Sequence, residues 1–277
     1  MYLGHFTNLR SLELIIERMR MKFGVLSNTN DPFENKNLLF KVAITNKNLR
    51  LVTTTDRLLK NNVKDNFKLI CMTLTNNSEQ IYEKPRMWEQ YADNHRGCCL
   101  IFNKDKLDQQ FKKIKSSNEL YANRRVYYTL EKNREKIRKM IFDEDIESRL
   151  YQNGFKQQII SDYIWENREV FLFSKMEDWI SEKEYRYLIY SQNRNIVYME
   201  IADALEEIIL GEKVTNEYTG MIFNKFVSGE VKISKIEWVN GFPLKKEVED
   251  RIYVENNNTN EKMNKLTIDT FKKYQIE

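Results

Sequence analysis

The sequence predicts an α+β protein with a mixed or antiparallel central sheet and helical insertions. Short apolar, β-branched runs of strand length alternate along the chain with stretches whose apolar residues have helical spacing. Apolar residues make up 41% of the 277 residues and aromatic residues 12%, which is enough to form a substantial core. The net charge of +4 is small, so the composition permits a nucleic-acid partner without indicating one.

The first helix is predicted over residues 8–22, because Leu12, Ile15 and Ile16 recur at helical spacing after a possible N-cap at Thr7 or Asn8. Pro85 predicts the start of a helix that runs to Asn94. The continuous apolar run over residues 98–102 predicts a central strand. The other expected strands are residues 23–27, 38–44, 67–75, 126–128, 185–190, 196–201, 207–210 and 233–239, and the other expected helices are residues 104–116 and 216–227.

The expected domain organisation is a single α+β domain over residues 1–244, followed by a polar C-terminal tail, residues 245–277. Residues 130–176 are expected to form a helical insertion, with Ile160 and Tyr163 among its core positions. The chain has only 8 glycines and 3 prolines, and no linker is visible between domains. The tail is expected to be loosely attached.

The sequence predicts a cytoplasmic protein without a membrane span or a structural metal site. No apolar stretch approaches the roughly 20 residues that a membrane helix needs. The three cysteines, Cys71, Cys98 and Cys99, form neither a disulfide framework nor a Cys-x-x-Cys zinc motif. The two histidines, His5 and His95, limit any chemistry that depends on imidazole.

The first two candidate motifs lie near the N-terminus. The His5–Thr7 segment precedes a helix N-terminus, a position that suits anionic groups; the alternative is a helix cap beside a surface histidine. The Asn30–Glu34 segment is Asn-Asp-Pro-Phe-Glu, in which Asn30 and Asp31 can close a turn through side-chain hydrogen bonds. Glu34 is either catalytic or solvated.

The third motif spans Trp88–Gly97. Trp88, Tyr91 and His95 are spaced three and four residues apart, which places them on one face of the predicted helix. Such a face can stack on a nucleobase or a nicotinamide ring, and the same spacing is also typical of a helix that packs on the core.

The fourth motif combines Lys175 with the segment Trp179–Arg186. Glu182 and Glu184 are separated by one residue at a strand entry, so they are expected on the same side of the chain. Paired carboxylates suit acid–base catalysis or the stabilisation of a positively charged transition state. With Lys183 and Arg186 beside them, they can equally form an ion-pair cluster.

Taken in order, the four motifs resemble a bacterial family catalogued as domain of unknown function 2971. The family pattern is His-aromatic-Thr, then Asn-Asp-Pro-Phe-Glu, then Trp-x-x-Tyr-Ala ending in His-x-Gly, then Lys followed by Trp-x-x-Glu-x-Glu-Tyr-Arg. The resemblance extends over about residues 1–215 and includes Ile-Ile-Leu-Gly at residues 208–211. The family name implies no activity.

The layout is also similar to that of ADP-ribosyltransferases, especially nucleic-acid-modifying branches with a short N-terminal His-x-Thr. This resemblance implies NAD as cofactor, a toxin or phage-defence effector as the biological setting, and a nucleic acid or a protein as acceptor. It implies that Glu184 stabilises the oxocarbenium ion as nicotinamide leaves and that Glu182 engages the acceptor. The residues expected to bind the dinucleotide are His5, Thr7, Asn30, Trp88, Tyr91, His95 and Arg186.

Two other functions remain open from the sequence. A non-catalytic binding or regulatory protein would use Trp88, Tyr91 and Trp179 as core or interface residues. A metal-dependent nuclease would use carboxylates and a lysine to hold Mg²⁺ against a phosphodiester, and its candidate residues are Asp31, Glu34, Glu182, Glu184 and Lys175. The chain has neither a glycine-rich phosphate loop nor a Gly-x-Gly-x-x-Gly turn. The acceptor, which can also be water, and the oligomeric state are left open.

Overall fold

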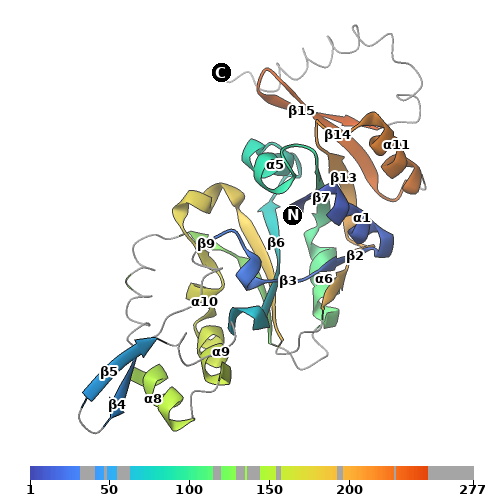
Figure 1. The fold of residues 1–277 in the computed structure, drawn as a ribbon. Helices are drawn as coiled ribbons and strands as arrows, with labels where there is room; N and C mark the ends of the chain where they lie inside the picture. The colour runs from blue at the N-terminus through green and yellow to red at the C-terminus, as the bar shows by residue number, and fades with distance from the viewer. Residues whose placement is uncertain are drawn as a thin grey trace, which may run out of the picture. The chain divides into compact units, whose positions relative to one another are not determined.

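The structure is a computed structural model that describes most of the chain (Figure 1). The described residues are 1–31, 41–46, 49–54, 63–114, 120–128, 135, 144–153, 157–191, 196–227 and 229–248. They divide into two compact units, each assembled from separate stretches of chain. Unit 1 comprises Met1–Arg20, Met72–Gln110 and Glu200–Glu277, and unit 2 comprises Met21–Cys71 and Phe111–Met199. The prediction of one domain over residues 1–244 stays a prediction.

Unit 1 contains a mixed, mostly antiparallel sheet with the strand order β15-β14-β13-β7-β1-β6. Its strands are β1 (Tyr2–Thr7), β6 (Phe67–Thr75, of which unit 1 holds the last four residues), β7 (Cys98–Asn103), β13 (Leu205–Leu210), β14 (Lys232–Val239) and β15 (Phe242–Glu247). Only the pairing of β13 with β14 is parallel among the registers found in this unit. The expected mixed or antiparallel central sheet is therefore confirmed.

Helices pack on this sheet through apolar faces. The helices that begin in unit 1 are α1 (Leu9–Arg18), α4 (Glu79–Tyr82), α5 (Pro85–Tyr91), α6 (Lys104–Ile114) and α11 (Asn216–Lys225). The predicted core positions Leu12, Ile15 and Ile16 of α1 are buried, and the Asn8 side chain caps the helix by accepting a hydrogen bond from the Ser11 N–H. Both α4 and α5 pack against β1.

Unit 2 contains the strand order β6-β11-β8, and β3 also pairs with β6. Its strands are β2 (Arg20–Lys22), β3 (Gly24–Val25), β4 (Lys41–Asn46), β5 (Leu49–Thr54), the first five residues of β6, β8 (Tyr121–Arg125), β9 (Tyr127–Tyr128), β10 (Ser174–Lys175), β11 (Glu184–Tyr190) and β12 (Tyr198–Glu200). Separate two-stranded sheets join β4 with β5, β9 with β10, and β2 with β12.

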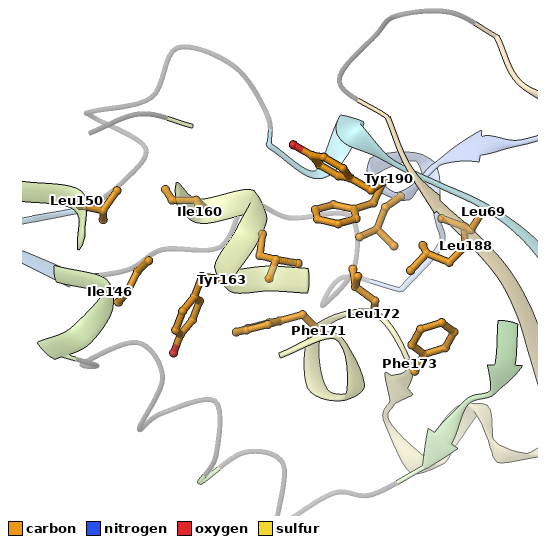
Figure 2. Packing of buried hydrophobic residues seen from close by; sticks show 13 residues of the cluster. Leu69, Ile146, Leu150, Ile160, Tyr163, Phe171, Leu172, Phe173, Leu188 and Tyr190 are labelled. Atoms are coloured by element: carbon orange, nitrogen blue, oxygen red, sulfur yellow. The ribbon is translucent and has the colours of Figure 1, made fainter. Parts of the chain in front are cut away.

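The helices of unit 2 are η1 (Leu26–Asn28), η2 (Val63–Asn66), α8 (Glu144–Gln152), α9 (Gln157–Glu166), α10 (Arg168–Phe171) and η4 (Glu177–Glu182). Of these, η1, α8, α9 and α10 contribute residues to a buried apolar cluster (Figure 2). Figure 2 shows Ile160 and Tyr163 of α9 and Phe171 of α10 in this cluster, together with Leu188 of β11. The core positions predicted for the helical tract are thus confirmed at Ile160 and Tyr163.

Several sequence-based boundaries differ from the structure; the helix expected over residues 8–22, for example, ends at Arg18. The tract 130–176, which was expected to be helical, contains the helices α8, α9 and α10 in its described part, and also the short strand β10 near its end. The strand β8 was not expected, since Tyr-Ala-Asn-Arg-Arg is mostly polar. The strand β15 extends to Glu247, past the expected start of the tail, because it pairs with β14 as far as Ser234 opposite Glu247. The rest of the tail, residues 249–277, lies outside the described residues.

Candidate functional site

The candidate site is a buried ion-pair network in unit 2, centred on the carboxylate of Glu184. Arg186 donates two hydrogen bonds to this carboxylate, from Nε to Oε1 at 2.6 Å and from Nη2 to Oε2 at 3.1 Å. The Arg186 side chain is completely buried, and its Nη1 also donates to the Leu172 carbonyl at 2.7 Å. A bidentate contact of this kind fixes both the position and the orientation of the carboxylate.

Lys175 joins the two carboxylates of the fourth motif. Its Nζ lies 2.7 Å from Oε2 of Glu184 and 3.0 Å from Oε2 of Glu182, and it sits 5.3 Å from the centre of the Trp179 ring. Glu182 and Glu184 are only 3% and 4% exposed. Two carboxylates and two cations therefore share one buried environment, and their formal charges sum to zero.

A left-handed residue brings the two carboxylates together. Glu182 ends η4 and Glu184 begins β11, while Lys183 between them has φ = 48°. The alternation of a strand cannot produce this convergence, because the strand starts only at Glu184. A non-glycine residue in the left-handed region is uncommon, and it persists where surrounding contacts stabilise it. The carboxylates lie on the same side of the chain, as expected, but for a different reason.

Two further residues of the network come from distant parts of the sequence. The hydroxyl of Tyr128 accepts a hydrogen bond from the Glu184 backbone N–H at 2.8 Å. The half-buried thiol of Cys71, on β6, hydrogen-bonds the Glu184 carboxylate. None of the four motifs contains these residues, and no local pattern around them indicates a site.

The electrostatics of the network keep Glu184 ionised. Burial alone raises the pKa of its carboxyl, but the charges of Arg186 and Lys175 outweigh burial and lower the pKa to about 2. The pKa of the Cys71 thiol is raised well above its ordinary value, first by burial and then by the Glu184 charge. Burial likewise raises the pKa of Tyr128. At neutral pH the network therefore holds an anion at Glu184 beside a protonated thiol and a protonated phenol.

The third motif forms a separate aromatic cluster in unit 1. Trp88 is completely buried, packs edge-on against Phe6 at 5.2 Å, and donates its indole N–H to the Tyr82 carbonyl at 2.8 Å. The His95 ring stacks on Trp88 at 6.2 Å and meets Trp238 edge-on at 6.0 Å. Burial, followed by the charge of Lys213, lowers the pKa of His95. Tyr91, at the end of α5, packs against the same cluster.

A left-handed turn positions His95. The helix expected to reach Asn94 ends at Tyr91, and Asp93, Asn94 and His95 have φ angles of 49°, 52° and 67°. The carbonyl of His95 accepts a hydrogen bond from the Lys213 N–H at 3.0 Å. A Cβ atom at Gly211 would lie 2.2 Å from that carbonyl oxygen, so only glycine fits there.

His5 and Thr7 face away from Trp88. Phe6 contacts Trp88, and a Cβ atom on Gly4 would touch Ile81, so the even positions of β1 face α4 and α5. Since side chains alternate along a strand, His5 and Thr7 project from the opposite face. His5 is half-buried and Thr7 is buried. The structure does not bring these two expected cofactor-binding residues together with Trp88.

The second motif is described only in part. Asn30 is exposed and Asp31 is buried, both in unit 2, whereas Phe33 and Glu34 lie outside the described residues. Within the described part of the chain, no three His, Cys, Asp or Glu side chains are grouped closely enough to hold a metal ion.

One family model matches part of the chain. None of the helices in the described part has the length and apolarity that a membrane span requires. No curated protein and no solved structure matches the chain. The family match includes the third and fourth motifs, from Trp88 to Arg186, and excludes His5, Asn30 and the other residues outside its range. Residues 87–187 match the family described as "Protein of unknown function (DUF2971)".

Proposed function

We propose that this chain is an NAD-dependent enzyme of the ADP-ribosyltransferase kind, in which Glu184 opposes the positive charge that develops as nicotinamide leaves. The observation that carries the proposal is the ionised, buried and firmly oriented carboxylate of Glu184 at the first residue of β11. An anion held by fixed partners in a dry site interacts more strongly with a developing cation than it would in water.

The paired carboxylate supports a division of roles. Glu182 shares the ammonium group of Lys175 with Glu184, so the two anions lie within reach of one cation. In this proposal Glu182 engages the acceptor and Glu184 faces the nicotinamide ribose. The acceptor is a protein, a nucleic acid or water. The dinucleotide contacts of His5, Thr7 and Tyr91, the toxin or phage-defence setting and the cytoplasmic location stay predictions.

The same network favours a second candidate function, a non-catalytic binding or regulatory protein. Both carboxylates are buried and ion-paired within the chain, as in a network that only stabilises a fold. Trp88 is a core residue whose indole N–H is already bonded. The two candidates differ in one respect that can be measured, because only the enzyme releases nicotinamide.

Nicotinamide release from labelled NAD tests the proposal. We expect the wild type to release nicotinamide when protein, DNA and RNA acceptors are supplied. Glu184→Gln keeps the size of the side chain but removes its charge, and it is expected to reduce the rate by about 100-fold or more. Glu177→Gln, which changes an exposed carboxyl of η4, is the matched control and should leave the rate unchanged.

The controls for this experiment separate folding from chemistry. Circular dichroism must show that Glu184→Gln keeps the wild-type fold. Release by the wild type that persists in Glu184→Gln would remove Glu184 from the reaction. No release by the wild type with every class of acceptor would contradict the enzyme and favour the binding protein.

A further inference from the structure

We infer that Lys175 is a positioning residue, whose ammonium group joins Glu182 and Glu184 into one unit and sets where the two carboxylates lie. This inference rests on the proposed function of Glu184. The Lys175 amine contacts one oxygen of each carboxylate, at 3.0 Å and 2.7 Å. An ammonium group has three donors, and here two of them are directed to the two carboxylates.

The backbone fixes the Lys175 side chain relative to Glu184. Lys175 ends the two-residue strand β10, and its register partner in the parallel strand β9 is Tyr128. The Tyr128 hydroxyl in turn accepts the backbone N–H of Glu184. Lys175 and Glu184 are thus attached to the same neighbouring residue, one through the sheet and the other through a side chain. The location of the amine follows from this framework.

Trp179 limits where the amine can move. The Lys175 Nζ lies 5.3 Å from the centre of the Trp179 ring, a distance at which the ring face attracts a cation. Trp179 belongs to η4, the same short helix that ends at Glu182. The helix therefore supplies both an aromatic contact for Lys175 and one of the two carboxylates that Lys175 holds.

The charges around Lys175 show what its loss would do. The groups that face it are Glu182 from η4, Glu184 and Arg186 from β11, Cys71 from β6 and Tyr128 from β9. Without Lys175, two carboxylates share the single cation Arg186. The Lys175 charge lowers the pKa of Glu184, so without it Glu184 would bind a proton at a higher pH than before.

The alkylation rate of the Cys71 thiol depends on the charges around Lys175 and can be measured without any enzymatic reaction. The charges of Arg186 and Lys175 lower its pKa, and the charge of Glu184 raises it. At pH 8.5 the Glu184 carboxylate is ionised, and alkylation proceeds through the thiolate fraction. We expect Lys175→Met to slow alkylation of Cys71 about three- to tenfold, because loss of the lysine charge raises the thiol pKa. Glu184→Gln should accelerate it, and Lys175→Arg should restore the wild-type rate.

The experiment uses the full chain, iodoacetamide and peptide mass spectrometry. The buried Cys98 and Cys99 are internal controls for unfolding. If Cys98 and Cys99 become labelled in Lys175→Met, the charge-balanced variant Lys175→Met with Glu182→Gln replaces it, with a smaller expected slowing at Cys71 because loss of the Glu182 charge acts in the opposite direction. Alkylation of Cys71 at the wild-type rate or faster, in a variant whose Cys98 and Cys99 stay unlabelled, would overturn the inference.

A second readout connects Lys175 to the reaction. In Lys175→Met the acidic limb of the pH profile for nicotinamide release should move upward by about one pH unit, and Lys175→Arg should reverse this shift. An unchanged profile would also contradict the inference. If the wild type releases no nicotinamide, the proposed function fails, whereas the alkylation rates still decide whether the Lys175 charge acts on the network around Glu184.

Discussion

Replacing Arg186 with methionine is expected to lower the free energy of unfolding by about 3–5 kcal/mol. The guanidinium is completely buried and makes two hydrogen bonds to the Glu184 carboxylate. Removal of one partner of a buried pair leaves the other charge uncompensated in a medium that solvates it poorly. Methionine fills much of the same volume, so the loss reports on charge rather than on a cavity.

Urea unfolding of Arg186→Met measures this loss. Lys183→Met is the matched control, since it removes an exposed cation three residues away, and its effect should stay within about 0.5 kcal/mol. The double variant Arg186→Met with Glu184→Gln removes one charge of each sign and should recover part of the stability. Equal unfolding midpoints for Arg186→Met and the wild type would show that the network does not stabilise the fold.

Replacing Trp88 with alanine is expected to destabilise the protein by about 3–5 kcal/mol, the typical cost of truncating a fully buried tryptophan. The side chain packs against Phe6 and donates a hydrogen bond to the Tyr82 carbonyl, so its removal leaves a cavity and breaks this hydrogen bond. This result would assign the third motif to the core. Trp88→Phe, which keeps an aromatic ring, should lower the free energy of unfolding by less than Trp88→Ala does.

Thermal unfolding checks the prediction for Trp88. Met221→Ala is the control within unit 1, because Met221 is 60% exposed and its truncation should change stability by no more than about 0.5 kcal/mol. A Trp88→Ala variant that unfolds at the same temperature as the wild type but no longer binds NAD would instead support the stacking role that the sequence also permits.

The sequence is most informative where apolar spacing is regular. The helix α1 follows from Leu12, Ile15 and Ile16, and the central strand β7 follows from its continuous apolar run. The strands β8 and β15 are polar, so their pairing depends on neighbours that no local pattern reveals. Their existence is decided by tertiary structure, which overrides strand propensity.

The candidate site is predictable only in the part that one sequence segment contains. Glu182, Glu184 and Arg186 stand within five residues, and their spacing already indicates either paired carboxylates or an ion-pair cluster. Cys71 and Tyr128 reach Glu184 from sequence separations of 113 and 56 residues, and only the folded chain brings them there. The sequence also does not indicate the left-handed conformation of Lys183, because lysine is not a residue that favours this conformation.

The pH titration of the Glu184 carboxyl tests the account most directly. Its ¹³C chemical shift, assigned by comparison with Glu184→Gln, can be followed in protein labelled at glutamate side chains. We expect this carboxyl to stay ionised from pH 8 down to pH 4, because Arg186 and Lys175 lower its pKa from the ordinary 4.5 to about 2. A titration midpoint at or above 4.5 would contradict the account, since Glu184 would then lack the fixed negative charge on which the proposed function depends.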